Sequence, residues 1–237
     1  MHKFLDKMAG KDKQRRFDEM STFSNVYQNF DFKVPELKNN KNEIVDLKGK
    51  WNEKHFKKNQ PITLELACGK GEYTVALSAR FPKRNFIGVD IKGARIHDGA
   101  KKCLTAEQEN AAFLRTRIEL LPEFFAAEEV SEMWIVFSDP FPKDRHAKHR
   151  LTSPFFLDVY RKICKKDCII NVKTDSELLF DYTLEMIAEQ KLPVYIMERD
   201  IYKTGYENEL LTEIQTFYEK QHIADGRKIN YVQFSLN

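Results

Sequence analysis

Downstream of Pro61, short apolar runs alternate with longer segments of helical character, and this alternation constrains the fold more than any other feature of the sequence. Six runs have the length and composition of buried strands: residues 62–67, 85–89, 112–115, 133–137, 168–173 and 193–197. Helices are expected between them at residues 72–80, 92–109 and 175–190, with a further helix that begins at Pro154. Strands that alternate with helices predict an α/β fold, in which a mostly parallel sheet carries helices on both faces.

The end of the chain follows a different pattern. Thr216 and Glu219 have the spacing of a capping box that opens a short helix, and Gly226 fits its C-terminal stop. Residues 229–236 then read as a last strand, which arrives by a short connection and is expected to be antiparallel. The result is a seven-stranded sheet that resembles the class I methyltransferase (Rossmann-like) fold.

Residues 1–60 are expected to form an N-terminal arm that is distinct from a methyltransferase-like domain at residues 61–237. The arm is rich in Lys, Asn, Gln and aromatic residues and shows no sustained period, which predicts a partly irregular segment. A basic run at residues 11–16 leaves two interpretations open: a solvated tail, or an electrostatic contact with RNA phosphates.

Composition narrows the class of protein without naming a partner. The 39 Lys and Arg residues are nearly balanced by 36 Asp and Glu residues, so the net charge of +3 is too small to indicate nucleic-acid binding by itself. The four cysteines show no zinc-ligand spacing, so we expect reduced thiols and no metal site. No stretch approaches the ~18 consecutive apolar residues of a membrane span, which predicts a soluble, cytoplasmic protein without membrane contact.

The loop after the first predicted strand carries small residues at every second position: Ala67, Gly69 and Gly71. Ligands of open α/β sheets bind at the carboxyl ends of strands, and small residues let the backbone approach a ligand closely there. A dinucleotide fingerprint requires a glycine at the sixth position of such a loop, but this chain has the bulky, charged Glu72. A nicotinamide-dependent dehydrogenase is therefore disfavoured.

The same loop resembles the S-adenosylmethionine loop of methyltransferases, in which acidic side chains lie near the positively charged methionine end of the cofactor. Glu65, two residues before the loop, fits that role. Asp90, at the end of the second strand, is placed to accept hydrogen bonds from both ribose hydroxyls, although an acid at a strand end also serves as a helix cap. Together these features favour S-adenosyl-L-methionine as cofactor, with S-adenosyl-L-homocysteine as its product.

The most informative stretch of the chain, residues 138–151, follows the fourth predicted strand. Asp139 emerges there at the edge of the sheet where ligands bind, and Phe141 lies between two prolines that restrict the backbone. Six side chains of the stretch can carry positive charge: Lys143, Arg145, His146, Lys148, His149 and Arg150. An acid that positions a base edge, a ring that stacks and cations that hold phosphates suit a nucleic-acid substrate; the alternative is a rigid, charged surface loop.

Residues 138–150 resemble the Pro-Asp-Pro-Trp-Pro-Lys-x-Arg-His-x-Lys-Arg-Arg motif of the bacterial tRNA (guanine-N7-)-methyltransferases. The loop at 65–71, Asp90, Thr174-Asp175 and the capping-box sequence follow in that family's order, so the resemblance covers residues 61–237. It implies a class I methyltransferase fold, S-adenosyl-L-methionine as methyl donor and tRNA as partner. The family methylates N7 of the guanine at tRNA position 46, in the variable loop.

The resemblance assigns roles to individual residues. Asp139 matches the family's catalytic candidate and, with Glu65 and Asp90, its cofactor contacts. The residues that match substrate contacts are Lys143, Asp175, Thr216, Phe217, Tyr218 and Glu219. The cations expected to hold RNA phosphates are Lys143, Arg145, Lys148 and Arg150. Two alternatives stay open, because Asp175 also fits a helix N-cap and Thr216 with Glu219 also fits a capping box.

The chain departs from the family pattern at several positions. Ala67 stands where the family has its first glycine, and Ser138 and Phe141 replace its Pro and Trp. After the third strand the family commonly has Arg-x-Asp-Ala, whose acid contacts the adenine, whereas this chain has Arg-Thr-Arg-Ile at residues 115–118. We therefore expect backbone groups around Arg117 and Ile118 to hold the adenine.

The chemistry implied by the resemblance needs no general base. Guanine N7 carries a free lone pair at neutral pH and the sulfonium already activates the methyl group, so catalysis is mostly orientation, and Asp139 is expected to position the guanine edge. Two other activities stay open: an exocyclic-amine (adenine-type) methyltransferase, whose Asp/Asn-Pro-Pro-aromatic motif differs in order, and a non-catalytic module that binds S-adenosyl-L-methionine and RNA. We expect a monomer or homodimer without an obligate protein partner.

Overall fold

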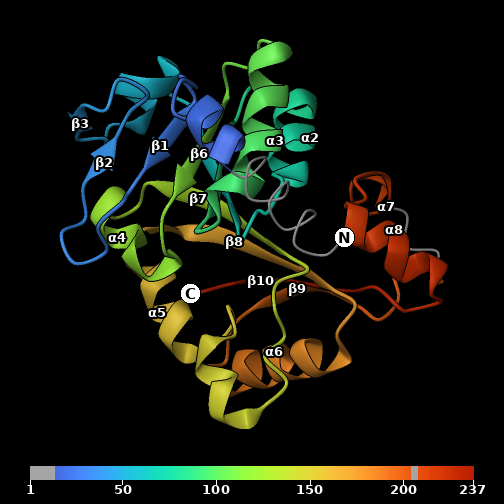
Figure 1. Ribbon diagram of the computed structural model, residues 1–237. Coiled ribbons are helices and arrows are strands. Elements are labelled where there is room, and N and C mark those ends of the chain that lie inside the picture. The colour runs from blue at the N-terminus through green and yellow to red at the C-terminus, as the bar shows by residue number, and fades with distance from the viewer. Residues whose placement is uncertain (1–13, 204–207) are drawn as a thin grey trace.

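Within residues 14–203 and 208–237, which the computed structural model describes, ten strands form one mixed sheet covered by helices on both faces (Figure 1). Seven strands run in the order β6-β5-β4-β7-β8-β10-β9. They are β4 (Ile62–Leu66), β5 (Asn85–Asp90), β6 (Ala111–Arg115), β7 (Val130–Val136), β8 (Cys164–Thr174), β9 (Val194–Glu198) and β10 (Asn230–Ser235). The pairs among β4 to β8 are parallel, whereas β10 is antiparallel to β8 and β9. The expected α/β fold with an antiparallel last strand is confirmed.

Three short strands from the described part of the N-terminal arm extend this sheet beyond β6. They are β1 (Val26–Gln28), β2 (Leu37–Lys38) and β3 (Ile44–Val45), of which β1 is parallel to β6. Strands of two or three residues give no periodic signal, which is why the sequence predicted a partly irregular arm. A π-helical turn, η1 (Trp51–Phe56), follows, and both of its terminal aromatic side chains are buried in the same core as β4. The domain division at residue 60 stays a prediction.

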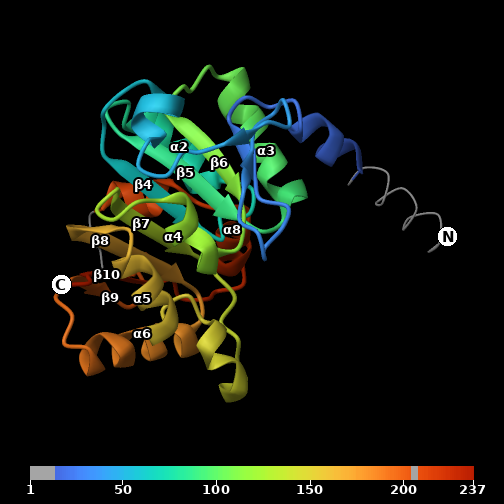
Figure 2. The ribbon, with the colours of Figure 1, turned by 90° about the vertical axis from the view of Figure 1, so that its left-hand side faces the viewer.

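The helices form two layers, one on each face of the sheet (Figures 1 and 2). One layer contains α2 (Glu72–Arg80), α3 (Gly93–Thr105), α7 (Glu209–Glu213) and α8 (Phe217–Ala224). The other contains α4 (Leu121–Phe124), α5 (Pro154–Arg161) and α6 (Glu177–Glu189). Two short 3-10 helices, η2 (Ile118–Leu120) and η3 (Asp144–His149), lie in the connections that follow β6 and β7.

The expected element boundaries agree with the structure to within a few residues. α3 ends at Thr105 rather than near residue 109, because the chain turns back there and Gln108 N donates to Cys103 O (2.9 Å). β8 begins at Cys164 rather than at residue 168, since residues 165–167 at its start are exposed and charged and therefore do not read as a buried strand.

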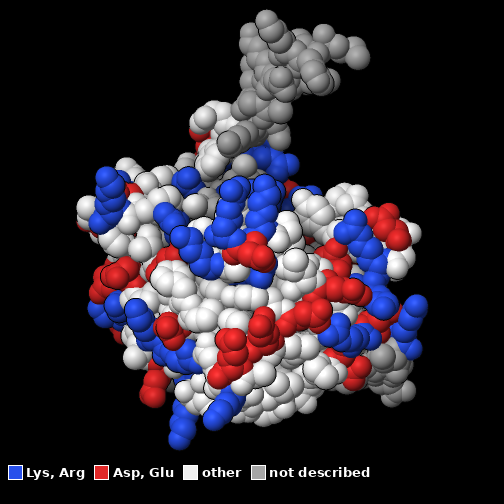
Figure 3. Space-filling view, turned by 90° about the horizontal axis from the view of Figure 1, so that it is seen from below, with Lys and Arg blue, Asp and Glu red and all other residues white. Residues whose placement is uncertain are grey.

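The surface carries both signs of charge, as the balanced composition predicts. Figure 3 shows the molecule from below, and on this face basic side chains gather in some areas and acidic side chains in others. A contact with an anionic partner therefore depends on local groups of cations rather than on the overall charge. In the part of the chain that the structure describes, every helix is too short or too polar to cross a bilayer.

The turn from β4 into α2 holds three residues in the left-handed region of backbone conformation: Ala67 (φ 54°), Gly69 (φ 55°) and Gly71 (φ 67°). Cys68 N donates to Val89 O (3.0 Å), so the turn is fixed to the end of β5. A left-handed residue with a Cβ costs about 1–2 kcal/mol, which the two glycines avoid and Ala67 bears. The alternating small residues thus serve the tight backbone path at this edge of the sheet.

We expect Gly71→Ala to destabilise the protein by more than the cost of placing an alanine in the left-handed region. An added Cβ would lie 2.4 Å from Cε1 of the buried Phe113. Gly226→Ala is the matched control, because Gly226 has a similar φ of 70° but nothing within 4 Å of such a Cβ. In urea denaturation, Gly226→Ala should lower the free energy of unfolding by about 1–2 kcal/mol, and Gly71→Ala by ~1–3 kcal/mol more. Equal losses in the two variants would contradict the predicted clash.

Candidate active site

The carboxyl ends of β4, β5, β6 and β7 meet at one edge of the sheet, where a cavity of about 340 Å³ opens. Five residues predicted to contact the cofactor line it: Ala67, Asp90, Arg117, Ile118 and Asp139. Further walls come from Glu119, Ser138, Phe141, His149, Leu151 and Phe156. The structure therefore brings the ends of the first four predicted strands to a single site.

Asp90 joins the turn after β4 to the start of α3. Its Oδ2 accepts a hydrogen bond from Gly69 N (2.9 Å), and its Oδ1 accepts one from Lys92 N (2.7 Å). The side chain is buried, yet it also lines the cavity. Asp90 does not cap α3, because the N-cap Lys92 has no side-chain cap hydrogen bond; its carboxylate instead fixes the turn and the backbone before α3, and its cofactor role stays a prediction.

The cavity combines apolar walls with polar groups. Ile118, Leu151 and Phe156 belong to the main core or pack against it, and they supply flat apolar surface to the cavity. Ser138 is buried, and its hydroxyl has no hydrogen-bond partner among the described residues. Glu119, two residues past the position of the family's adenine-contacting acid, forms an ion pair with Arg117 (2.8 Å). Apolar walls, hydroxyl and carboxylate together suit a nucleoside.

A second cavity, of about 110 Å³, shares Ala67 with the first. Its other walls include Glu65, Gly69, Phe137, Thr216, Phe217 and Tyr218. The acid that precedes the turn and three of the predicted substrate residues therefore meet in one small space.

Glu65 holds the first turn of α2 from the end of β4. Its Oε2 accepts hydrogen bonds from Thr74 N (2.7 Å) and from Thr74 Oγ1 (2.5 Å). The side chain is 5% exposed, and this burial raises the pKa of the carboxyl to about 7. A nearby positive charge would favour its ionised form, so a cationic ligand group suits the second cavity.

The loop after β7 is held in a strained conformation around the predicted catalytic acid. Phe137 (φ 49°) and Phe141 (φ 43°) both occupy the left-handed region, two residues to either side of Asp139. Asp139 is exposed, and its Oδ1 accepts a hydrogen bond from Phe141 N (2.9 Å). Its other carboxylate oxygen has no hydrogen-bond partner in residues 14–203 and 208–237. The loop thus orients the acid and leaves one oxygen available.

Arg150 anchors this loop from the protein side. Its Nε donates to Pro140 O (3.0 Å) and its Nη2 donates to Phe141 O (3.0 Å), while the guanidinium lies 4.4 Å from the centroid of the Tyr182 ring. The side chain is 4% exposed. The sequence grouped Arg150 with the cations for RNA phosphates, but the structure buries it beneath the loop, where a planar guanidinium suits two fixed carbonyls.

The other three predicted phosphate-binding cations, Lys143, Arg145 and Lys148, are exposed on or beside η3. The ring of His149 lies 5.7 Å from the ring of Phe141, and both line the larger cavity. η3 therefore carries exposed cations and, through His149, packs against Phe141 of the preceding loop at the candidate site.

Asp175 is held away from the helix-capping position that the sequence left open. Ser176 caps α6 instead, because its side chain accepts a hydrogen bond from Leu179 N (3.2 Å). Asp175 pairs with Arg227 (2.9 Å), and His222 Nε2 lies 3.6 Å from it. This predicted substrate residue thus links the end of β8 to the C-terminal end of α8.

α8 begins with the predicted capping box. Thr216 Oγ1 accepts from Glu219 N (3.1 Å), and Glu219 accepts from Thr216 N (3.4 Å). Glu219 is fully buried and pairs with Lys173 Nζ (2.5 Å), and burial lowers the pKa of Lys173. Phe217 and Tyr218 are each 51% exposed. Glu219 therefore acts as a positioning residue for α8, while the two rings that follow its N-cap line the second cavity.

Some residues of the site escaped the sequence analysis. Lys173 lies inside a predicted strand, and a charged residue there is itself a signal, because lysines are almost never fully buried unless they are paired. Phe156 on α5 gave no signal, since an apolar residue on a helix normally belongs to the core. Ser138 was noticeable only as a departure from the family motif.

Comparison with known proteins shows which family this chain belongs to. A family described as "Putative methyltransferase" matches residues 59–232. A tRNA (guanine-N(7)-)-methyltransferase of Christiangramia forsetii is 46% identical over 229 residues, which cover 97% of this chain and 100% of the relative. This chain belongs to the tRNA (guanine-N(7)-)-methyltransferase family. The protein of that name from Bacteroides thetaiotaomicron is 44% identical over 227 residues, 96% of this chain and 86% of the relative.

Solved structures share the fold of this tRNA (guanine-N(7)-)-methyltransferase family member. The 16S rRNA methyltransferase KamB matches with a TM-score of 0.60 at 14% identity, over 81% of this chain and 95% of that chain. A 16S rRNA (adenine(1408)-N(1))-methyltransferase from Catenulisporales acidiphilia, solved with its cosubstrate SAM, matches with a TM-score of 0.59 at 12% identity, over 81% and 92%. At these identities the likeness shows the class I methyltransferase fold.

The 16S rRNA (adenine(1408)-N(1))-methyltransferase has S-adenosyl-L-methionine (SAM) as its cosubstrate. The two cavities of the present chain fit the two parts of this compound chemically: the larger offers apolar walls, the Asp90 carboxylate and the unpartnered Ser138 hydroxyl to a nucleoside, and the smaller offers the Glu65 carboxyl to a cation. In the described residues no cluster of His, Cys, Asp and Glu is arranged to hold a metal ion.

Glu65→Gln is expected to change how stability depends on pH. The Glu65 carboxyl has its pKa raised from 4.5 to about 7 by burial, so the unfolded chain ionises first as pH rises. Wild-type stability should therefore fall between about pH 4.5 and pH 7 and stay lower above it, by up to about 3 kcal/mol relative to Glu65→Gln. Urea denaturation at pH 5 and pH 8 measures this difference.

Glu53→Gln is the control for that experiment, because Glu53 is an exposed glutamate on η1. Glutamine keeps an acceptor for Thr74 N, so the Glu65 variant removes the ionisation and retains the hydrogen bond. Parallel stability curves for wild type and Glu65→Gln over this range would refute the assigned pKa.

Proposed function

We propose that this protein transfers the methyl group of S-adenosyl-L-methionine to N7 of a guanine in tRNA, at position 46 of the variable loop. One observation carries the proposal: Asp139, at the end of β7, and Ala67, in the turn after β4, line the same cavity. The acid after β7 and the small-residue turn after β4 therefore border one space of about 340 Å³, which supports a shared site for the methyl donor and the guanine. A relative named for this reaction is 46% identical, which supports the same chemistry here.

The cofactor-binding roles follow from the lining of the two cavities. Asp90 accepts hydrogen bonds from the ribose hydroxyls, and backbone groups at Arg117 and Ile118 hold the adenine against the apolar wall. Glu65 and the turn that contains Ala67 accommodate the methionine end. When bound, the sulfonium supplies a methyl group that is already activated for transfer, so the protein needs no group to activate it.

Asp139 positions the guanine. Its Oδ1 is fixed by Phe141 N, and its free oxygen is suited to accept a hydrogen bond from guanine N1 or from the exocyclic amino group. Arg150 secures the loop from beneath, so the acid is held in place before the substrate arrives. Holding two reactants in line supplies roughly 7–11 kcal/mol at best, which makes orientation the main catalytic device.

The tRNA is held on both sides of this acid. Lys143, Arg145 and Lys148 contact phosphates from η3, and Asp175 and the start of α8, with its half-exposed Phe217 and Tyr218, contact the substrate from the other side. We further propose that the protein works in the cytoplasm as a monomer or homodimer without an obligate protein partner.

A methylation assay with labelled S-adenosyl-L-methionine and unmodified tRNA, followed by aniline cleavage at 7-methylguanosine, tests the activity and Asp139. We expect wild type to produce cleavage at position 46. Asp139→Asn should lower kcat by about 10²-fold with tRNA affinity unchanged, because its amide would place a donor against the guanine donors. Asp144→Asn on the same loop should retain full turnover.

Other outcomes of the assay would overturn these assignments. If the methyl group is found on an exocyclic amine, or if no methylated product forms, the proposed reaction is refuted. Near-wild-type turnover in Asp139→Asn would remove the role of the acid.

The exposed cations of η3 should set the salt dependence of tRNA binding. Each lost phosphate contact lowers the slope of log affinity against log salt by about 0.7–0.9, so the triple variant Lys143→Ala, Arg145→Ala, Lys148→Ala should have a slope shallower by about 2–3. Arg150 is left intact because it supports the loop. A triple alanine variant at Lys162, Lys165 and Lys166, exposed at the opposite edge of the sheet, should keep the wild-type slope. An unchanged slope in the η3 variant would place these cations outside the RNA contact.

A further inference from the structure

The segment that follows β1 lies at the same edge of the sheet as the candidate site. β1 is parallel to β6, and Gln28 pairs with Arg115, so the residues after Gln28 emerge beside the carboxyl end of β6 (Figure 2). Asn29 N donates to Arg115 O (2.9 Å), and Asn29 Nδ2 donates to Thr116 Oγ1 (3.3 Å). The backbone position of this segment is therefore fixed relative to the cavity.

This segment exposes apolar side chains at every second residue. Phe30 is 56% exposed, Phe32 37% and Val34 56%. Asp31 fixes the bend between them, because its Oδ1 accepts hydrogen bonds from Lys33 N (2.8 Å) and Val34 N (3.4 Å). Core packing does not account for the two large rings at these positions, because each ring leaves a substantial part of its surface in water.

Each exposed ring rests on a guanidinium from the β6 end. Arg115 lies 5.3 Å from the centroid of Phe30 and 5.2 Å from that of Phe17, so it sits between two rings. Arg117 lies 5.8 Å from the centroid of Phe32 and also lines the larger cavity. We define Phe30, Phe32, Arg115 and Arg117 as the arm platform.

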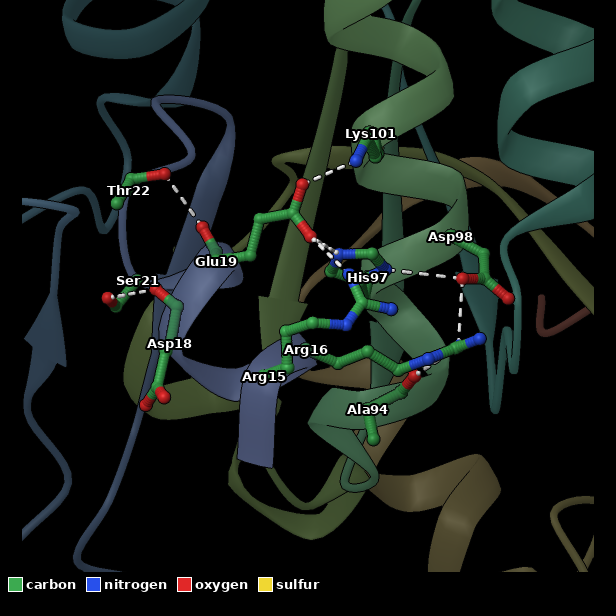
Figure 4. Close-up of polar contacts among 10 residues, drawn as sticks. All are labelled: Arg15, Arg16, Asp18, Glu19, Ser21, Thr22, Ala94, His97, Asp98 and Lys101. Carbon is green, nitrogen blue, oxygen red and sulfur yellow. Dashed lines mark hydrogen bonds and ion pairs between the residues drawn. The ribbon is translucent and has the colours of Figure 1, made fainter. Parts of the chain in front are cut away.

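The arm platform is braced by a helix of the N-terminal arm. Residues 14–20 are helical and dock on α3 (Figure 4), whereas residues 11–13 of the predicted basic run lie outside the described residues. Arg16 pairs with Asp98 (2.8 Å), and Glu19 pairs with His97 (2.9 Å) and with Lys101. Hydrogen bonds from Lys101 and then from His97 lower the pKa of Glu19 to about 2.

The docking also brings side chains of the arm close to the backbone of α3. A Cβ at Gly93 would lie 2.7 Å from the ring of Phe17 and 3.0 Å from Cδ of Arg115, so a larger residue at position 93 would displace these side chains. The rings are thus presented on a supported surface rather than on a free tail.

We propose that the arm platform stacks unpaired bases of the tRNA substrate. Nucleic-acid bases stack on exposed aromatic rings and on guanidinium planes, and single-stranded RNA is recognised in this way. The platform adjoins the cavity through Arg117, and η3 adjoins the same cavity through His149, so both surfaces lie within reach of one RNA. This inference rests on the proposed function, and it adds a binding surface formed jointly by the segment after β1 and by the end of β6.

The test compares Phe30→Ala/Phe32→Ala with wild type in binding of an unmodified tRNA transcript. Loss of each stacked base should weaken binding by about fivefold or more, so the pair should raise Kd by about 20-fold or more. The salt slope should stay unchanged, because stacking releases no counterions. Affinity for S-adenosyl-L-homocysteine and the Tm should match wild type, and Phe30→Tyr/Phe32→Tyr should restore binding.

Tyr195→Ala is the matched control, since Tyr195 is 55% exposed on β9 at the far edge of the sheet. An unchanged Kd for tRNA in the Phe30/Phe32 double variant would overturn the proposal. So would weaker binding of S-adenosyl-L-homocysteine without loss of tRNA affinity, because the rings would then close the cofactor cavity.

Failure of the platform and failure of the proposed reaction give different results. If wild type forms 7-methylguanosine and the double variant binds tRNA as tightly as wild type, the stacking role of the platform is refuted and the proposed reaction stands. If wild type forms no 7-methylguanosine, the proposed reaction is refuted, but binding of a short unpaired RNA oligonucleotide still tests the platform. Equal affinity of wild type and the double variant for this oligonucleotide would refute the platform.

Discussion

The parallel pairing of β4 between β5 and β7 is the interaction on which the site depends. Leu66 of β4 pairs with Val89 of β5 and with Ile135 of β7, so the three strands end at the same level. Parallel strands direct their carboxyl ends to one edge, which places the small-residue turn, Asp90 and Asp139 around one cavity. Burial of both faces of the sheet preserves this register, since a slip of one residue would exchange the two faces.

The loops at that edge adopt conformations that they would not hold in isolation. Ala67, Phe137 and Phe141 lie in the left-handed region, at about 1–2 kcal/mol each. The buried guanidinium of Arg150 offsets this strain by binding two carbonyls of the loop after β7. Strained residues therefore flank both the turn and the acid, where reacting groups have to be held in one geometry.

A buried ion pair sets the opposite wall of the site. Lys173 of β8 and Glu219 of α8 are both fully buried, and such a pair contributes little net stability compared with apolar side chains of the same volume. Breaking it by removing one partner is costly, however, so it specifies where α8 begins. Phe217 and Tyr218 consequently line the second cavity together with Glu65, which lies on a different strand.

The sequence by itself determined the strand order along the chain, the turn at residues 67–71 and the acid after β7, because each depends on a local pattern of apolar runs, small residues or prolines. Only the tertiary structure decided that residues 26–45 add strands to the sheet, because strands of two or three residues form only when they pair with neighbouring strands. It also decided that Arg150 supports a loop while Lys148 stays exposed. Two cations in one basic run look alike in sequence, and whether a charge faces solvent or protein depends on the groups that folding packs against it.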